Sequence, residues 1–372
     1  MPLKILHTSD LHLGMKFASY ECEVQEKLVE ARFECLSRLV AAANDNGCDL
    51  LVVAGDLFDR VTVAKRDIVR AAAAFGDFEG AAVVVLPGNH DYTSADKSDL
   101  WHTFKEATQG NVLVCDEPRP YPLAKFDVDA TVYPAPCTSK HSAVNAIGWI
   151  ADVERAADVT YHIGLAHGSL EGVSPDFDGR YFPMTTGELE TLELDIWLLG
   201  HTHKPYPQTP SPGDRVFLAG TPEPDGFDCD HSGSAWVHEM EDGAPQSQLI
   251  SVGQYRFEHE AKSIATEKDL QDVAVSFADA NSNNLLLKVK ISGRLPAEAY
   301  GRLGEVEAAV AGSVFHLRWD DSAVTRQVTT AEIDETYTEG SFPHRLLHSL
   351  ARSDENFEAL QKAHEIIEEL RR

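Results

Sequence analysis

The sequence predicts an α/β protein in which a mostly parallel sheet is flanked by helices. Short apolar runs, which are typical of buried strands, alternate with longer amphipathic segments along residues 3–91. Alternating strands and helices of this kind form parallel sheets joined by helical crossovers. Each run also ends in a loop of Gly, Asp, Asn and His residues. Open α/β sheets place their functional sites at this edge, outside the carboxyl ends of the strands.

The first part of the chain shows the alternation most clearly. Strands are expected at residues 3–7, 49–54 and 83–86, and helices at residues 23–45 and 64–76. The first helix has an apolar stripe with helical spacing, and Asn46-Gly47 is a typical end for it. The second strand is apolar throughout, as expected for a strand that is buried on both faces.

Strands predominate after residue 110. They are expected at residues 111–114, 121–126, 130–134, 160–166, 195–199, 215–219, 234–240 and 246–252. One helix is expected at residues 140–156, and the Gly-, Pro- and Asp-rich stretch 169–186 is typical of a long loop. The strands at 160–166 and 195–199 again end in polar motifs, His167-Gly168 and Gly200-His-Thr-His203.

The length of 372 residues and a restart of the pattern after residue 254 indicate more than one domain. We expect a first domain over residues 1–254, a smaller α/β domain over 255–328 and a helical C-terminal segment over 329–372. The expected elements of the smaller domain are a helix at 267–280 with Thr266 as N-cap, strands at 285–291 and 314–319, and a helix at 296–311. The last helix is expected to begin after a cap at Ser353 or Asp354.

The chain is strongly acidic, with a formal net charge of −28 and a pI near 4.8. A negative field of this size repels nucleic acid at long range, which argues against DNA as a partner. Divalent cations would neutralise part of this negative charge. One local run is basic although the chain as a whole is acidic, and it consists of Arg60, Lys65, Arg66 and Arg70. The remaining acidic residues are interpreted as a solvent-exposed surface without a specific role.

Other global features indicate a cytoplasmic protein. No apolar run of about 18 residues is present, so no membrane span is expected. The N-terminus lacks the regions that make up a signal peptide. The six cysteines are scattered without paired spacing, which favours free thiols in a reducing compartment over disulfides or a thiolate metal site.

The segment Pro87–Asp91 points to a metal site. The apolar strand before it stops at Pro87-Gly88, and an amide, an imidazole and a carboxylate follow at once in Asn89, His90 and Asp91. A simple turn does not need this combination, whereas metal ions bind all three kinds of group. The other strand ends carry similar groups, which makes the segment one part of a larger set.

The full set of donor side chains at strand ends suits a pair of metal ions. It comprises Asp10, His12, Asp56, Asn89, His90, His167, His201 and His203. Oxygen and imidazole donors without a thiolate suit Mn²⁺, Fe or Zn²⁺ and disfavour Ca²⁺. The set is too large for one ion, and two ions that share a bridging carboxylate can clamp the attacking and leaving oxygens of a phosphoryl displacement. Residues i and i+2 of a strand end share a side, so Asp10/His12 and His201/His203 can each act as a pair.

These motifs resemble those of the calcineurin-like metallophosphoesterase superfamily over about residues 1–250. The resemblance rests on Asp10-Leu-His12, Gly55-Asp56 with Asp59, Gly88-Asn-His-Asp91, His167-Gly168 and Gly200-His-Thr-His203. Within the superfamily, His7–Gly14 and Gly55–Asp59 are similar to the SbcD-type DNA-repair exonuclease subunit, and the unit after residue 255 resembles the capping domain of those nucleases. The implied fold is a four-layer α/β/β/α sandwich with a smaller α/β capping domain and a helical C-terminal tail.

The resemblance also implies roles for the residues. One ion is expected to be held by Asp10, His12, Asp56 and His203, and the other by Asp56, Asn89, His167 and His201, with Asp56 as the bridge. Mn²⁺ is the expected metal. His90 is expected to protonate the leaving oxygen or to stabilise the transition state, with Asp91 orienting it. Archaeal and eukaryotic relatives carry a histidine where this chain has Asp59, which is expected to support the ligands without binding an ion.

The implied function is hydrolysis of DNA phosphodiester bonds by a hydroxide that two metal ions activate, in a DNA-repair exonuclease or endonuclease. The implied partners are DNA ends, an SbcC-like coiled-coil ATPase bound through the C-terminal region, and a second copy of the chain, with no membrane. Two alternatives stay open. The acidity favours a phosphodiesterase for small or nucleotide substrates, and a non-catalytic scaffold on the same fold would need neither His90 nor a full ligand set.

Overall fold

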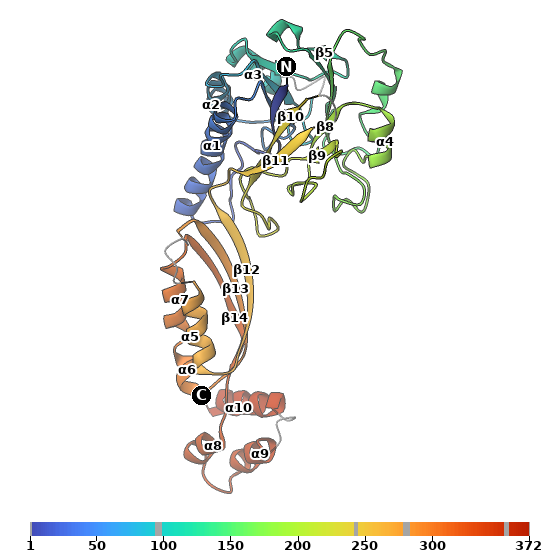
Figure 1. The fold of residues 1–372 in the computed structure, drawn as a ribbon. Helices are drawn as coiled ribbons and strands as arrows, with labels where there is room; N and C mark the ends of the chain where they lie inside the picture. Colours follow the sequence, from blue (N-terminus) through green and yellow to red (C-terminus); the bar gives the residue numbers. More distant parts are fainter. Residues whose placement is uncertain (1, 94–98, 242–244, 278–282, 353–356, 372) are drawn as a thin grey trace. The chain divides into compact units, whose positions relative to one another are not determined.

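The computed structural model of the chain describes residues 2–93, 99–241, 245–277, 283–352 and 357–371 (Figure 1). The chain divides into two compact units, Met1–Arg256 and Phe257–Arg372. The first unit contains the six-stranded and five-stranded sheets, and a three-stranded sheet lies at the start of the second. All of the predicted site residues belong to the first unit.

The six-stranded sheet has the strand order β11-β10-β1-β2-β3-β4. Its strands are β1 (Leu3–Thr8), β2 (Leu50–Ala54), β3 (Ala82–Leu86), β4 (Val112–Val114), β10 (Ser234–Met240) and β11 (Gln246–Ser251). The first four run parallel to one another, and β10 pairs antiparallel with β1. The carboxyl ends of β1, β2 and β3 therefore lie together at one edge of the sheet.

The five-stranded sheet has the order β5-β6-β7-β8-β9. Its strands are β5 (Tyr121–Pro122), β6 (Ala130–Ala135), β7 (Tyr161–His167), β8 (Ile196–Gly200) and β9 (Val216–Leu218). Strands β6 to β9 are parallel, and the short β5 pairs antiparallel with β6. Two of the predicted ligand motifs follow β7 and β8 in this sheet.

The two sheets and their helices form four layers, as expected. Helices α1 (Cys22–Asp45), α2 (Lys65–Gly76) and α3 (Asp99–Ala107) pack on one face of the six-stranded sheet, where alternate strand residues such as Leu51 and Val53 join their core. The other face, with Leu50 and Val52, shares a core with the five-stranded sheet. The outer face of that sheet packs against α4 (Thr186–Thr191) and the 3₁₀ helix η2 (Gly148–Asp152). The predicted α/β/β/α sandwich is confirmed.

Several expectations about local structure in this unit were wrong. The strand predicted at 121–126 is limited to β5, and a 3₁₀ helix at Ala124–Phe126 follows it. The helix predicted at 140–156 is reduced to η2, because the segment before it pairs with the loop after β7: the Ser142 amide donates to the Arg180 carbonyl oxygen at 2.8 Å. Helix α3 lies where no helix was predicted. Its Trp101 and Phe104 are buried, and they contact Phe58 in the core beneath the helices.

The second unit begins with an α/β arrangement. Its elements are β12 (Arg256–Ile264), α5 (Glu267–Ser276), β13 (Leu285–Leu295), α6 (Ala297–Gly301), α7 (Leu303–Ala311) and β14 (His316–Arg326). Thr266 caps α5 as predicted, since its side chain accepts a hydrogen bond from the Asp269 amide. Strand β12 was not predicted, because its sequence is mostly polar and only its Phe257 and Ile264 are buried.

The chain ends in the helices α8 (Thr330–Thr336), α9 (Phe342–Leu350) and α10 (Phe357–Arg371). Their shared core is small and consists of Val328, Ile333, Tyr337, Leu347 and Leu360. The predicted caps Ser353 and Asp354 lie outside the described residues, and a separate segment over 329–372 stays a prediction. In the part of the chain that the structure describes, no helix has the length and apolar character needed to cross a membrane.

Candidate metal centre

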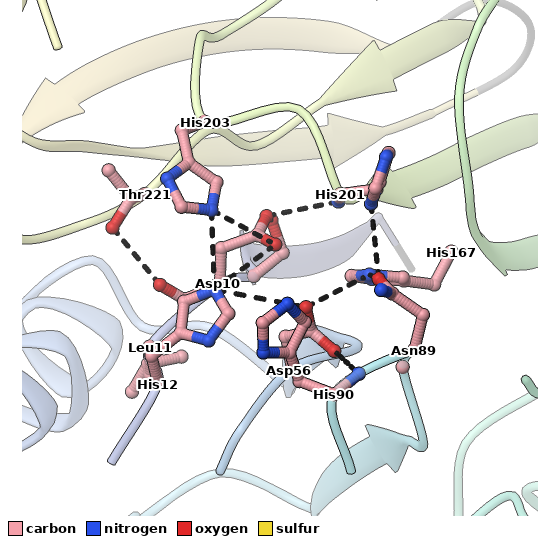
Figure 2. Close-up of polar contacts among 12 residues, drawn as sticks. Asp10, Leu11, His12, Asp56, Asn89, His90, His167, His201, His203 and Thr221 are labelled. Atoms are coloured by element: carbon pink, nitrogen blue, oxygen red, sulfur yellow. Dashed lines mark hydrogen bonds and ion pairs between the residues drawn. The ribbon is translucent and has the colours of Figure 1, made fainter. Parts of the chain in front are cut away.

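The predicted ligands converge where the carboxyl ends of β1, β2 and β3 meet those of β7 and β8 (Figure 2). The side chains brought together are Asp10, His12, Asp56, Asn89, His90, His167, His201 and His203. Most of them are buried, and they come from both sheets of the sandwich. Segments separated by more than a hundred residues therefore build one site.

The loops after β1 and β2 are joined backbone to backbone at the site. The Asp10 amide donates to the Gly55 carbonyl oxygen at 3.1 Å, and the His12 amide donates to the Asp56 carbonyl oxygen at 3.0 Å. Asp10, His12 and Asp56 all have left-handed backbone conformations, with φ of 54°, 45° and 53°. Non-glycine residues adopt such angles at a cost and keep them where the surroundings enforce them, often at functional sites. The two loops are thus held in the conformation that presents their side chains inward.

Two glycines allow the close approach of the ligands. Gly55 has a φ of 94°, and a Cβ at this position would lie 2.1 Å from Nδ1 of His167. A Cβ on Gly88 would lie 2.2 Å from Oδ1 of Asp56. Any side chain at either position would displace a predicted ligand, which explains why glycine precedes the polar residues at these strand ends.

The first group of donors surrounds Asp10. Nε2 of His12 and Nε2 of His203 lie 3.2 Å apart, and each lies close to Oδ1 of Asp10, at 4.0 and 3.9 Å. Oδ2 of Asp56 lies 3.8 Å from Nε2 of His12. These separations are close to the spacing of atoms that bind one common ion at bond lengths of about 2.0–2.2 Å.

The second group of donors surrounds the same Asp56 carboxylate on its other side. Nε2 of His167 lies 3.3 Å from Oδ2 of Asp56 and 3.0 Å from Oδ1 of Asn89. Nδ1 of His201 lies 3.1 Å from the same Asn89 oxygen. Asp56 Oδ2 thus faces donors of both groups, which is the position of a bridging ligand.

The hydrogen bonds of two histidines leave one ring nitrogen of each as an acceptor that faces the site. His167 Nδ1 donates to the Ala54 carbonyl oxygen at 2.8 Å, and a carbonyl can only accept. His203 Nδ1 donates to Oδ2 of Asp225 at 3.3 Å. In the neutral rings the inward Nε2 atoms then carry lone pairs, and ring nitrogens that bind metals are usually fixed in this way from behind.

A buried acceptor without a donor and a strong local negative charge show that the residues fit a cation. Asp10 Oδ1 is buried and has no hydrogen-bond partner among the described residues. Burial lowers the pKa of His167, but the Asp56 carboxylate beside it outweighs burial and raises that pKa to about 9. The proton that His167 takes up supplies positive charge that a bound cation would otherwise supply. Divalent ions held by these side chains would satisfy the acceptors directly.

His90 lies at the mouth of the site and is held by a residue that we did not expect. Its Nδ1 donates to the backbone carbonyl oxygen of Asp59 at 3.0 Å, and its amide donates to Oδ1 of Asp56 at 2.8 Å. The expectation that Asp91 orients His90 is corrected, because the Asp91 carboxylate accepts from the amides of Gly88 and Phe58 at 2.7 and 3.0 Å. Asp91 instead ties the loops after β2 and β3 together.

Asp59 also differs from the expectation that its side chain supports the ligands. Its carboxylate pairs with Arg60, with Oδ2 of Asp59 2.5 Å from a terminal guanidinium nitrogen. The part of Asp59 that reaches the site is its backbone carbonyl, which holds the His90 ring.

Two functional residues were missed from the sequence. Asp225 holds His203 from behind, and Arg32 of α1 lies 3.2 Å from the same Asp225 oxygen with its side chain only 1% exposed. Burial alone would raise the pKa of Asp225, but the hydrogen bond from His203 and the charges of His203 and Arg32 hold it well below its usual value. An ionised Asp225 keeps the proton on Nδ1 of His203 and its other nitrogen free.

Asp225→Asn is expected to lower the affinity of the site for metal by about 10–100-fold, because residues that hold a ligand from behind typically contribute that much. The substitution keeps the shape of the side chain and removes the charge that fixes the His203 ring and pairs with Arg32. Calorimetric titration of the purified chain with Mn²⁺ measures the change. Asp228→Asn, an exposed carboxylate in the same loop, is the matched control. Equal affinities for the two variants would contradict a role for Asp225.

Comparison with known proteins identifies the family. The sequence pattern of the calcineurin-like phosphoesterase family matches residues 3–205. The uncharacterized metallophosphoesterase YhaO of Bacillus subtilis is 29% identical over 215 residues, which are 54% of this chain and 49% of that protein. The DNA double-strand break repair protein Mre11 of Saccharolobus solfataricus is 25% identical over 223 residues, which are 59% of this chain and 55% of that protein.

A third relative matches a shorter region. The SbcD component of the nuclease SbcCD from Bacillus subtilis is 34% identical over 92 residues, which are 24% of this chain and 22% of that protein. The chain thus spans about half the length, or less, of the curated relatives it matches. The family match covers residues 3–205 of the 372 and includes the strand ends from β1 to β8 that carry the donor groups. Members of this family use a dinuclear metal centre. This chain therefore belongs to the calcineurin-like phosphoesterase family.

Proposed function

We propose that this chain is a DNA nuclease of the SbcD type that hydrolyses phosphodiester bonds at a pair of divalent metal ions. The observation that carries the proposal is the position of Asp56 between two groups of donors, with His90 beside them. Relatives that are named as a nuclease component and as a DNA double-strand break repair protein support DNA as the substrate. Mn²⁺ is the proposed metal, since oxygen and imidazole donors suit it.

Each ion would take ligands from both sheets. We assign Asp10, His12, Asp56 and His203 to one ion and Asp56, Asn89, His167 and His201 to the other. When bound, such a pair of ions polarises the phosphate ester and lowers the pKa of bound water, so that hydroxide is available near neutral pH. Asp10 and Asp56 supply the negative charge that holds both ions, and the backbone of their loops keeps them in place.

His90 is proposed to act on the substrate. Its Nδ1 is occupied by the Asp59 carbonyl oxygen, so Nε2 is the nitrogen left for the phosphate. A protonated Nε2 can donate to the oxygen that leaves the phosphorus atom or to the charge that builds up on the phosphate. Because the ring is held from the backbone and its own amide is fixed on Asp56, it can move little when substrate binds.

The acidity of the chain limits how DNA reaches this site. Three members of the basic run have acidic partners: Arg60 pairs with Asp59, Arg66 with Asp67 and Arg70 with Glu30. The run therefore adds little net positive field to a chain whose formal charge is −28. We infer that bound metal ions and His90 would provide most of the attraction for the scissile phosphate. Salt screens the repulsion between the acidic chain and the DNA phosphates, so added salt should not weaken DNA binding here, whereas it weakens DNA binding by basic nucleases.

The proposal predicts that the chain with Mn²⁺ cleaves single- and double-stranded oligonucleotides, and that raising monovalent salt from about 20 to 150 mM does not suppress cleavage. Product release is measured by gel electrophoresis, with bis(p-nitrophenyl) phosphate as a small phosphodiester in parallel. Efficient cleavage of the small diester alone would favour the small-substrate phosphodiesterase. If the chain cleaves neither substrate and binds no metal, the result would favour the non-catalytic scaffold.

The C-terminal helices are the proposed docking site for an SbcC-like coiled-coil ATPase, and DNA ends are the proposed substrate of the complex. We also propose that the chain forms a homodimer and works in the cytoplasm. Phe342, Ile366 and Leu370 on α9 and α10 are 70%, 45% and 82% exposed, which leaves apolar surface that a partner could cover. The cleavage assay is therefore repeated with the ATPase present. Removing residues 353–372 should abolish co-purification with it and leave the metal content unchanged, whereas an intact complex would refute the docking site.

A further inference from the structure

A second cluster of possible metal ligands, Asp334, His344 and His348, lies among the C-terminal helices of the second unit. His344 and His348 are four residues apart on α9, so their rings lie on one face of the helix with centroids 4.5 Å apart. Asp334 comes from α8 and faces both rings. The cluster thus joins two helices that share only a small apolar core.

The polar atoms of the cluster converge on one point. Nε2 of His344 and Nε2 of His348 lie 2.9 and 2.6 Å from the same oxygen, Oδ1 of Asp334. The hydrogen bonds from His348 and His344 lower the pKa of Asp334, so its carboxylate is ionised at neutral pH. Two imidazoles that turn the same ring nitrogen toward one carboxylate oxygen form the arrangement in which a cation can replace the shared protons.

We propose that Asp334, His344 and His348 bind a single Zn²⁺ ion that fastens α8 to α9. Two imidazole nitrogens and one carboxylate oxygen are a ligand set that suits Zn²⁺ in tetrahedral coordination, with water in the fourth position. The site shares no residue with the candidate metal centre, and its ion would join two helices while a water fills the open fourth position. It does not depend on whether the chain cleaves DNA.

Small movements would suffice to accept the ion. Ligands at tetrahedral positions about 2.0–2.1 Å from Zn²⁺ are roughly 3.3 Å apart, so the separations of 2.9 and 2.6 Å would open by roughly 0.4 and 0.7 Å. The side chains of His344 and His348 are 14% and 30% exposed, and that of Asp334 is 56% exposed, so the carboxylate can move and water can reach the ion. One contact opposes binding: the Gly340 amide points at Nδ1 of His344, which must carry a proton when Nε2 binds metal. At 3.4 Å this hydrogen bond is long, and losing it costs little.

An ion at this position would matter because the apolar core of the helices is small. Ile333 and Leu347, on α8 and α9, are among the few residues that the two helices bury together. Small units with little core often depend on a metal for part of their stability, since the binding free energy is also folding free energy. Zn²⁺ would set the angle between the two helices and so the shape of the surface that α9 offers to a partner.

The test compares the zinc content of untagged full-length variants. After dialysis against buffered micromolar Zn²⁺, the wild type is expected to retain one more Zn²⁺ per chain than the double variant His344→Gln/His348→Gln. The control His259→Gln, which removes a histidine from strand β12 of the same unit, should match the wild type. Both variants keep the candidate metal centre, so the difference reports the new site alone. Equal zinc content in the wild type and the double variant would show that the cluster is an ion pair without metal.

A second variant protects the test against misfolding. Asp334→Asn changes an exposed side chain and should leave the helices folded, as circular dichroism in chelator can verify. It is expected to lose the additional Zn²⁺ as the double variant does. When Co²⁺ replaces Zn²⁺ as the probe, the wild type should show the strong visible absorption of tetrahedral cobalt. This absorption should be weaker in Asp334→Asn. An unchanged spectrum and zinc content in this variant would overturn the proposal.

Discussion

Asp56→Asn is expected to lower kcat/KM for phosphodiester hydrolysis by at least about 10³-fold, equivalent to about 4 kcal/mol of transition-state stabilisation. Oδ2 of Asp56 lies between His12 and His167, within 3.8 and 3.3 Å of their Nε2 atoms. The asparagine can keep its oxygen on the His90 amide, which holds Oδ1 at 2.8 Å, and then places an NH₂ group at the bridging position. An NH₂ group is a donor and cannot bind a cation. Mass spectrometry of bound metal and steady-state kinetics measure the two losses.

The control for Asp56→Asn is Asp59→Asn, because both residues lie in the same loop and undergo the same chemical change. The Asp59 carboxylate pairs with Arg60, and only its backbone carbonyl reaches the site. We expect Asp59→Asn to retain metal and most of the activity. An Asp56→Asn variant that binds metal and cleaves substrate like the control would remove the bridging role from Asp56.

His90→Ala is expected to lower kcat by about 10²–10⁴-fold, the usual contribution of a group that transfers a proton in the transition state. The metal content should stay that of the wild type, because the donors of both groups remain in place. His90→Gln is the more conservative version, since its amide can still donate to the Asp59 carbonyl oxygen. Metal analysis and steady-state kinetics on the same sample show whether kcat falls while the bound metal stays, or whether both are lost together.

His102→Gln provides the matched control for His90. His102 lies on α3 with its side chain 69% exposed, and its substitution should change neither quantity. Loss of metal together with activity in His90→Ala would make His90 a ligand, and unchanged kcat would exclude it from the reaction.

The convergence of the donor side chains could be predicted because its information is local. Each motif follows an apolar strand directly, so the strand fixes where the motif lies, and parallel strands bring their carboxyl ends to one edge. Gly55 illustrates this: it could be expected to permit a tight approach, and a side chain there would collide with His167. The sequence could not show that His167 is the neighbour, which depends on how the two sheets face each other.

The residues that were missed depend on contacts between distant segments. Arg32 lies on α1 at helical spacing from the buried Leu28 and Leu36, so its place on the inner face could have been noticed, but its partner could not be predicted. Asp225 lies in a loop without a motif. Their contact exists only because the fold brings Arg32 of α1 beside the loop after β9, where Asp225 also holds His203. His90 and Asp91 show the opposite error. Neighbours in sequence were expected to interact, but the backbone turns their side chains toward different loops.

The spread of the ligands along the chain has a consequence for synthesis. His12 precedes His203 by 191 residues, yet their Nε2 atoms face one another at 3.2 Å. A chain emerging from the ribosome carries Asp10, His12 and Asp56 early, but it lacks their partners until β8 and the loop after it have appeared. The early carboxylates and imidazole alone are too few to enclose a pair of ions. The donor set of the candidate metal centre is therefore incomplete until β8 and the loop after it have been made, so a chain interrupted before residue 203 lacks part of the site.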